Sequence, residues 1–131
     1  MLSLDGLPAY PTIRGLFHGV RPGGQHAYCA IGLLLEAAVH AGIFERQMVI
    51  GQPQTWNIEA VEAHYGYRRA GLPPDENSYH WLDDEDMGAL GLTSSGRLKL
   101  MSWTDSVPAK TFPWMASQIR ADYSAFFFTP V

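Results

Sequence analysis

The segment from Gln25 to Phe44 constrains the fold of this 131-residue chain more than any other part of the sequence. It is a nearly continuous apolar run, and it contains Cys29, the only cysteine in the chain. Gly42 stands where a glycine commonly ends a helix. The segment therefore predicts one helix, over about residues 26–41, that is buried on most of its sides and organises the fold around it.

A helical wheel places few polar side chains on this predicted helix. At about 100° per residue, Glu36 and His40 lie within about 20° of Cys29, and most of the remaining circumference is apolar. The helix should thus carry one narrow polar stripe that includes the thiol. Glu36 and His40 are four residues apart, and we interpret them as a surface pair worth a few tenths of a kcal/mol.

Helix-start and helix-stop residues predict further helices in the middle of the chain. Asn57 fits as the N-cap of a helix that Gly66 would end. Ser94 or Ser95 fits as the cap of a helix that runs through Trp103. Between them, acidic residues open a short helix over 83–90, because acidic side chains favour the positive end of the helix dipole.

The C-terminal segment has a clear helical pattern. Thr111 fits as the cap of a last helix, with Pro113 tolerated in its first turn. The apolar residues of this helix recur at i, i+3, i+4, i+7 and i+11, which predicts a stripe that faces the core: Phe112, Met115, Ala116, Ile119 and Tyr123. The apolar tail at 126–128 is expected to dock on the core.

Extended segments look short and few. Residues 46–51 and 78–82 are strand candidates, and a hairpin of the two would need helices packed against it to be stable. Residues 1–24 contain three prolines and five glycines, which predicts an irregular N-terminal arm. We therefore expect residues 25–131 to form a single, mainly α domain. It would be a compact helical domain around the central buried helix, to which the two strand candidates could add a small two-stranded β element.

Charge and composition argue against several classes of function. The net charge is −4, and Arg68-Arg69 is the only pair of adjacent basic residues, so nucleic-acid binding through phosphate contacts is disfavoured. One cysteine and five scattered histidines lack the spacing of a metal site, and we expect no metal and no cofactor. The chain shows no signal peptide, and its apolar run is too short to cross a bilayer, so we expect no membrane partner and a cytoplasmic location.

Cys29 is the one residue with plausible nucleophilic chemistry, and it has two interpretations. A thiol in the first turn of a helix has its pKa lowered by the helix dipole, as in papain-like enzymes. His80 would then be the base and Asp83 or Asn77 would orient it, with His64 as the next candidate base. In the other interpretation Cys29 is a small packing residue, because free cysteine is among the most commonly buried residue types.

Trp114 is a candidate anchor for a protein partner. It falls off the apolar stripe of its predicted helix, beside Gln118, so both side chains should be accessible. Exposed tryptophans are enriched among the residues that contribute most to binding at protein interfaces. The alternative is that Trp114 covers the edge of the core.

Four short motifs follow one another within residues 25–123. They are Cys-x-x-Gly at 29–32, Leu-Gly-Leu at 90–92, Leu-Met-Ser-Trp-Thr-Asp-Ser at 100–106 and a Thr-Phe helix start at 111–112. In this order the chain resembles a widespread group of small hypothetical proteins encoded by tailed bacteriophages. Tyr28 stands where a second cysteine is frequent in that group, Thr104 replaces the usual asparagine, and Pro113 is atypical. The resemblance implies an accessory phage protein in a bacterial cytoplasm, and it carries no activity with it.

These observations favour a small, non-enzymatic phage accessory protein that binds a host or phage protein. The sequence offers no metal-ligand set, no basic face and no complete catalytic constellation, but it holds four tryptophans and six tyrosines. The alternative function is a papain-like cysteine hydrolase or transferase that uses Cys29 and His80.

Overall fold

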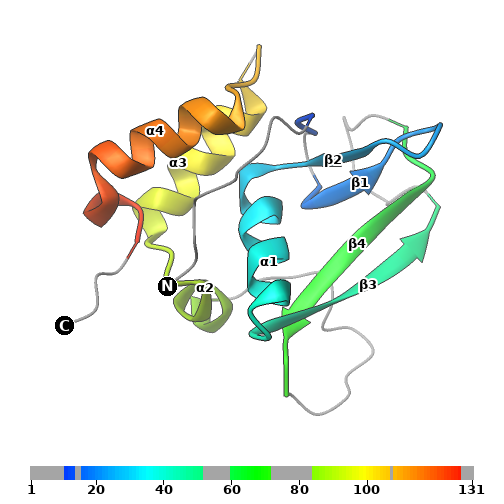
Figure 1. The fold of residues 1–131 in the computed structure, drawn as a ribbon, viewed down its shortest axis with the longest axis horizontal. Helices are drawn as coiled ribbons and strands as arrows, with labels where there is room; N and C mark the ends of the chain where they lie inside the picture. Colours follow the sequence, from blue (N-terminus) through cyan, green and yellow to red (C-terminus); the bar gives the residue numbers. More distant parts are fainter. Residues whose placement is uncertain (1–10, 14–15, 52–59, 72–83, 107, 128–131) are drawn as a thin grey trace.

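Sheet and helices both contribute to the fold, so the mainly α architecture predicted from the sequence is wrong. A computed structural model describes residues 11–13, 16–51, 60–71, 84–106 and 108–127. These residues form a four-stranded antiparallel sheet and four α-helices, a mixed α/β fold (Figure 1). In chain order the elements are β1 (His18–Val20), β2 (His26–Tyr28), α1 (Ala30–His40), β3 (Phe44–Ile50), β4 (Ala63–Arg69), α2 (Asp84–Leu90), α3 (Ser94–Asp105), α4 (Phe112–Ala121) and the 3-10 turn η1 (Tyr123–Ala125).

The sheet consists of two antiparallel pairs joined in the middle, with strand order β2-β1-β4-β3. β1 and β2 form a hairpin that includes the pair His18↔Tyr28, and its turn is closed by a hydrogen bond from the Arg21 N–H to the Gln25 carbonyl. β3 and β4 pair along their whole length. β1, which lies within the range 1–24 expected to be an irregular arm, pairs with β4 and so connects the two halves.

The central helix exists, but it begins later than predicted. Residues 26–28 form β2, and α1 starts at Ala30. Cys29 is the N-cap, since its backbone is extended and its sulfur accepts a hydrogen bond from the Gly32 N–H at 3.3 Å. The helix ends at His40 with Ala41 as its C-cap, and the predicted stop residue Gly42 follows with a φ of +77°, which is favourable for glycine.

Helix α1 separates the sheet from the other helices. Figure 1 shows the sheet on one side of α1 and the pair α3 and α4 on the other. Seven of its eleven residues are buried: Ala30, Ile31, Gly32, Leu33, Leu34, Leu35 and Ala38. The expectation of a helix enclosed on most sides is therefore confirmed, although a sheet provides one of the enclosing layers.

Close packing at the first turn of α1 explains the Cys-x-x-Gly motif. The Cys29 N–H donates to the Phe17 carbonyl at 3.2 Å, which draws the β1 chain against the helix. A Cβ atom on Gly32 would lie 1.6 Å from the same carbonyl oxygen. From the other side, the Thr104 hydroxyl on α3 accepts a hydrogen bond from the Ala30 N–H at 3.2 Å. The first turn of α1 is thus fixed between β1 and α3.

The prediction of a helix that ends at Gly66 is wrong for the second half of that segment. Residues 63–69 form β4, whereas residues 52–59, including Asn57, lie outside the described part of the chain. The helical spacing of Ile58, Val61 and Tyr65 obscured an alternating strand pattern over 63–69. The strand candidate at 46–51 is confirmed within β3, and its proposed partner at 78–82 lies outside the described residues.

The three C-terminal helices agree with the predicted ones. α2 and α4 begin within one residue of the expected positions, and Thr111 caps α4 through a bond from the Trp114 N–H. α3 is capped by Thr93, one residue before the expected Ser94. The stripe of α4 is buried from Phe112 to Ile119, while residue 123 lies in η1. Phe126 and Phe127 dock on the core as expected, and residue 128 lies outside the described part.

Candidate functional site

A polar cluster lies on the α1 side of the sheet, and its centre is His18. The His18 ring is buried between two tyrosine rings, with centroid distances of 4.1 Å to Tyr28 and 4.2 Å to Tyr65. These rings belong to β2, β1 and β4, which are neighbours in the sheet. Aromatic stacking on both faces fixes the plane of the imidazole, so its two nitrogens point in defined directions.

Each nitrogen of His18 has a hydrogen-bond partner. Nδ1 lies 3.1 Å from the Tyr67 hydroxyl and 3.4 Å from Oε1 of Glu36, and Nε2 lies 2.6 Å from Nδ1 of His26. The Tyr67 hydroxyl also donates to Oε1 of Glu36 at 2.5 Å. Glu36, His18 and His26 therefore form a continuous chain from the half-buried carboxylate to an exposed imidazole.

The donors in this chain determine the tautomers of both histidines. Tyr67 has one hydroxyl proton, which it gives to Glu36, so the Tyr67 oxygen must accept from His18 Nδ1–H. A neutral His18 then has a bare Nε2, which accepts a hydrogen bond from Nδ1–H of His26. A neutral His26 must in turn carry its free lone pair on Nε2.

Arg46 completes the cluster at its charged end. Its Nη1 donates to Oε2 of Glu36 at 2.6 Å, and its guanidinium carbon lies 6.0 Å from the centre of the Tyr65 ring. The Glu36 side chain is 14 % exposed and that of Arg46 is 40 % exposed, so the ion pair lies at the boundary between core and solvent. Glu36 is therefore not the surface partner of His40 that the helical wheel suggested.

The cluster changes the acidity of its members. Burial lowers the pKa of His18 and outweighs the opposing effect of Glu36, so His18 is neutral at neutral pH. Burial alone would raise the pKa of Glu36, but hydrogen bonds from His18 and Tyr67 and the charge of Arg46 lower it below its usual value. Burial and the neighbouring carboxylate raise the pKa of Tyr67 far above the normal range. The stable state has an ionised Glu36 and neutral His18 and Tyr67.

Cys29 caps the start of α1 and directly follows Tyr28, whose ring stacks on His18. Burial raises the pKa of its thiol to about 11, and the nearby Asp105 adds to this effect, although backbone hydrogen bonds oppose it. This shift is opposite to the lowered pKa that the nucleophile interpretation requires. His80 and Asp83, the predicted base and its orienting acid, lie outside the described residues. His64, the second candidate base, has its Nδ1 3.2 Å from the Gly51 carbonyl oxygen.

Trp114 and Gln118 are both exposed on α4, as the sequence predicts. The Trp114 side chain is held in place: its ring meets the Trp103 ring edge-on at 5.0 Å, and Nζ of Lys110 lies 5.2 Å from its centre. Trp114 remains 38 % exposed despite these contacts. It is thus a fixed aromatic surface next to a positive charge.

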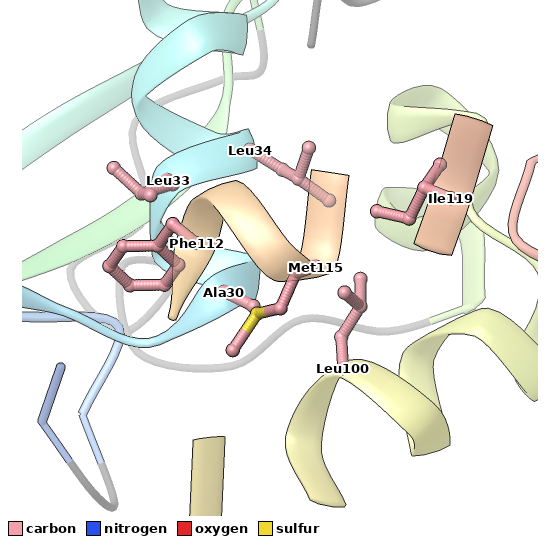
Figure 2. Close-up of a pocket in the computed structure, with 7 residues that line it drawn as sticks. All are labelled: Ala30, Leu33, Leu34, Leu100, Phe112, Met115 and Ile119. Atoms are coloured by element: carbon pink, nitrogen blue, oxygen red, sulfur yellow. The ribbon is translucent and has the colours of Figure 1, made fainter. Parts of the chain in front are cut away.

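The space between α1, α3 and α4 offers no site for a polar ligand. It holds an apolar gap about the size of one water molecule. Figure 2 shows the side chains that surround this gap, all of them apolar: Ala30, Leu33, Leu34, Leu100, Phe112, Met115 and Ile119. We interpret it as a small packing defect of the helical layer.

The described residues lack two other kinds of feature, a metal site and a membrane-spanning helix. No group of three or more His, Cys, Asp or Glu side chains there could hold a metal ion. No helix in the same part of the chain is long and apolar enough to cross a membrane.

Sequence reasoning missed the histidine cluster, although one local signal was present. The Pro22-Gly23-Gly24 run separates two short segments, 17–20 and 25–28, and a turn of this composition between two short segments is compatible with a hairpin. Read as a hairpin, this pattern places His18 opposite Tyr28. The contacts with Glu36 and Tyr67 have no such signal, because they depend on how α1 and β4 pack.

The comparisons with known proteins leave the chain without an assigned relative. No family model matches it, and neither the curated proteins nor the solved structures yielded a match. The candidate sites are therefore defined by their geometry alone.

Proposed function

We propose that this protein acts by binding another protein, as a small phage accessory protein in the cytoplasm of a bacterial host. The phage context comes from the motif resemblance at residues 29–32, 90–92, 100–106 and 111–112. The binding function is supported by one observation above all: Trp114 is exposed, yet its ring is immobilised by Trp103 and Lys110.

An immobilised aromatic is suited to recognition for an energetic reason. A side chain that is already fixed loses little conformational entropy when a partner covers it, so more of the contact free energy contributes to affinity. Gln118 lies one helical turn further along the exposed face of α4 and can both donate and accept hydrogen bonds. Together the two residues provide an apolar anchor with an adjacent polar contact, the usual composition at the centre of an interface.

The test is a quantitative capture experiment with a matched control. Tagged protein is used to isolate partners from a host lysate, and the affinity of an identified partner is then measured for the wild type, Trp114→Ala and Leu98→Ala. Leu98 is also an exposed apolar residue, but it belongs to α3. We expect Trp114→Ala to weaken binding by at least about tenfold, the range of an interface hot spot, and Leu98→Ala to leave it unchanged.

Folding of the variants is checked by circular dichroism, because Trp114 packs against Trp103. A partner that binds folded Trp114→Ala with wild-type affinity would show that this anchor is wrong. Partial weakening by Gln118→Ala would extend the contact surface along α4.

A further inference from the structure

The exposed end of the histidine chain has properties that a binding function does not explain. His26 is exposed, and its Nδ1–H is committed to the buried His18. Its Nε2 therefore carries the lone pair and faces away from the hydrogen-bonded side of the ring. In most exposed histidines nothing selects the tautomer, whereas here three further side chains do so: His18, Tyr67 and Glu36.

We propose that His26 is an acyl-acceptor site, at which Nε2 attacks the carbonyl carbon of an anhydride or activated ester. The buried chain behind it supplies the proton acceptor. This is the arrangement by which a carboxylate and a second group orient and activate an imidazole or hydroxyl nucleophile.

The step balances within the residues of the cluster. The Nε2 lone pair forms a bond to the acyl carbon, and the bond from that carbon to the leaving oxygen breaks, so the leaving group departs with the electron pair. Acylation makes Nδ1–H of His26 acidic, and this proton passes to Nε2 of His18. His18 then releases its Nδ1 proton to Glu36, either directly or through the Tyr67 hydroxyl. The products are a neutral acyl-imidazole at His26, the leaving group as its anion, and one added proton held by the His18–Glu36 pair.

The surroundings favour an uncharged acyl group over a phosphoryl group. Arg46 is paired with Glu36, and Arg21 donates to the Gln25 side chain and to the Thr12 carbonyl, so the nearest described cations are engaged. Apolar side chains continue from the cluster across the sheet. Ile50 is in the same cross-strand row as His26, and Met48 is the cross-strand neighbour of Tyr65. Ile50 is 76 % exposed and Met48 is 50 % exposed, so an apolar acyl chain could rest on them.

Diethyl pyrocarbonate, a carbonic anhydride, is the probe for this proposal. It is added at low molar ratio at pH 7, and the modification of each histidine is followed by peptide mass spectrometry. His40 is an internal control, because it is exposed at the end of α1. We expect His26 to be modified at least about a hundredfold faster than His40, the lower end of what a positioned base contributes.

The Glu36→Gln variant tests whether the buried chain is responsible. Without the Glu36 carboxylate, diethyl pyrocarbonate should modify His26 at a rate close to that of His40. The matched control is Glu45→Gln, which removes a carboxylate that pairs with Arg68 rather than with the histidine chain. This control should leave the His26 rate unchanged.

A measurement on the wild-type protein keeps the proposal falsifiable if Glu36→Gln does not fold. The ¹⁵N chemical shifts of the imidazole report the tautomer directly, and we expect His26 as the Nδ1–H form. An Nε2–H tautomer at His26 would overturn the proposal. So would equal rates for His26 and His40, or an unchanged His26 rate in folded Glu36→Gln.

Discussion

Two polar regions of this molecule differ in what holds them together. At the first turn of α1, the contacts are between backbone and small or short side chains: Cys29 caps the helix, Gly32 lies against the Phe17 carbonyl, and Thr104 receives the Ala30 N–H. In the histidine cluster, the contacts are between long side chains on five elements, with the buried His18 at their centre.

The comparison shows that the short sequence motifs and the histidine cluster involve different residues. Cys29, Gly32 and Thr104 belong to the motifs on which the phage resemblance rests, and all three have structural roles. The histidine cluster contains none of the motif residues, but it contains an exposed base and an ion pair at the solvent boundary. A short motif in this chain therefore indicates where the backbone is tightly packed and does not locate the chemistry.

The largest expected effect concerns the tight region. Gly32→Ala would place a methyl group 1.6 Å from the Phe17 carbonyl oxygen, which neither backbone can avoid without moving. We expect a loss of at least about 3 kcal/mol in the free energy of unfolding, measured by urea denaturation. Gly88→Ala is the control: Gly88 lies in α2 with nothing within 4 Å of its added Cβ, so this change should be neutral or stabilise by about 0.5–1 kcal/mol.

Alkylation of Cys29 tests whether the thiol has a structural role or acts as a nucleophile. With a pKa of about 11 in place of 9.0, the thiolate population near pH 7.5 is about a hundredfold lower than for an unperturbed cysteine. We expect iodoacetamide to react correspondingly slowly, with a rate that keeps rising with pH toward about 11. The urea-unfolded protein is the control and should react at the normal rate. Fast reaction of the folded protein at pH 7 would instead support the cysteine-enzyme alternative.

Thr104→Val should have a smaller, purely structural effect. The substitution keeps the shape of the side chain but leaves the buried Ala30 N–H without its acceptor. We expect a loss of about 1–3 kcal/mol in urea unfolding. Thr111→Val at the exposed cap of α4 is the comparison and should cost only about 1 kcal/mol, since water can replace the lost hydroxyl. If both substitutions reduce the free energy of unfolding by the same amount, burial does not increase the cost of losing the Thr104 hydroxyl.

The pH dependence of stability should originate in the histidine cluster, and it is the smallest effect. The pKa of His18 is lowered from 6.5 and that of Glu36 from 4.5. In the pH range between the folded and the unfolded pKa of each group, the unfolded chain therefore binds more protons than the folded one. The contribution of these two groups to the free energy of unfolding is therefore fully present above about pH 6.5, and it decreases as the pH falls through their folded pKa values. Thermal unfolding between pH 7.5 and 3 should show this decrease, and Glu36→Gln should lack the part below pH 4.5. A melting temperature that rises on acidification would contradict the assigned charges.

The sequence predicted the helices better than the sheet, for physical reasons. Caps and glycines are local signals, so Thr111, Gly42 and the buried stripe of α4 could be recognised from neighbouring residues alone. β1 and β2 have three residues each, too few to show alternation, and β4 was hidden by helical spacing that ends at Tyr65. Trp114 could be placed on an exposed face from its helix alone. The partners of Glu36 could not be predicted in this way, because they depend on how α1 packs on the sheet.

The way the sheet is joined gives the histidine cluster a mechanical role as well. Only two register pairs, Gly19↔His64 and Val20↔Ala63, connect the hairpin of β1 and β2 to that of β3 and β4. His18 reaches across this seam to stack on Tyr65 and to bond Tyr67. Separation of the two hairpins would remove the Tyr67 hydroxyl from the proton path between His18 and Glu36, so we expect the reactivity of His26 to fall when β1 and β4 come apart.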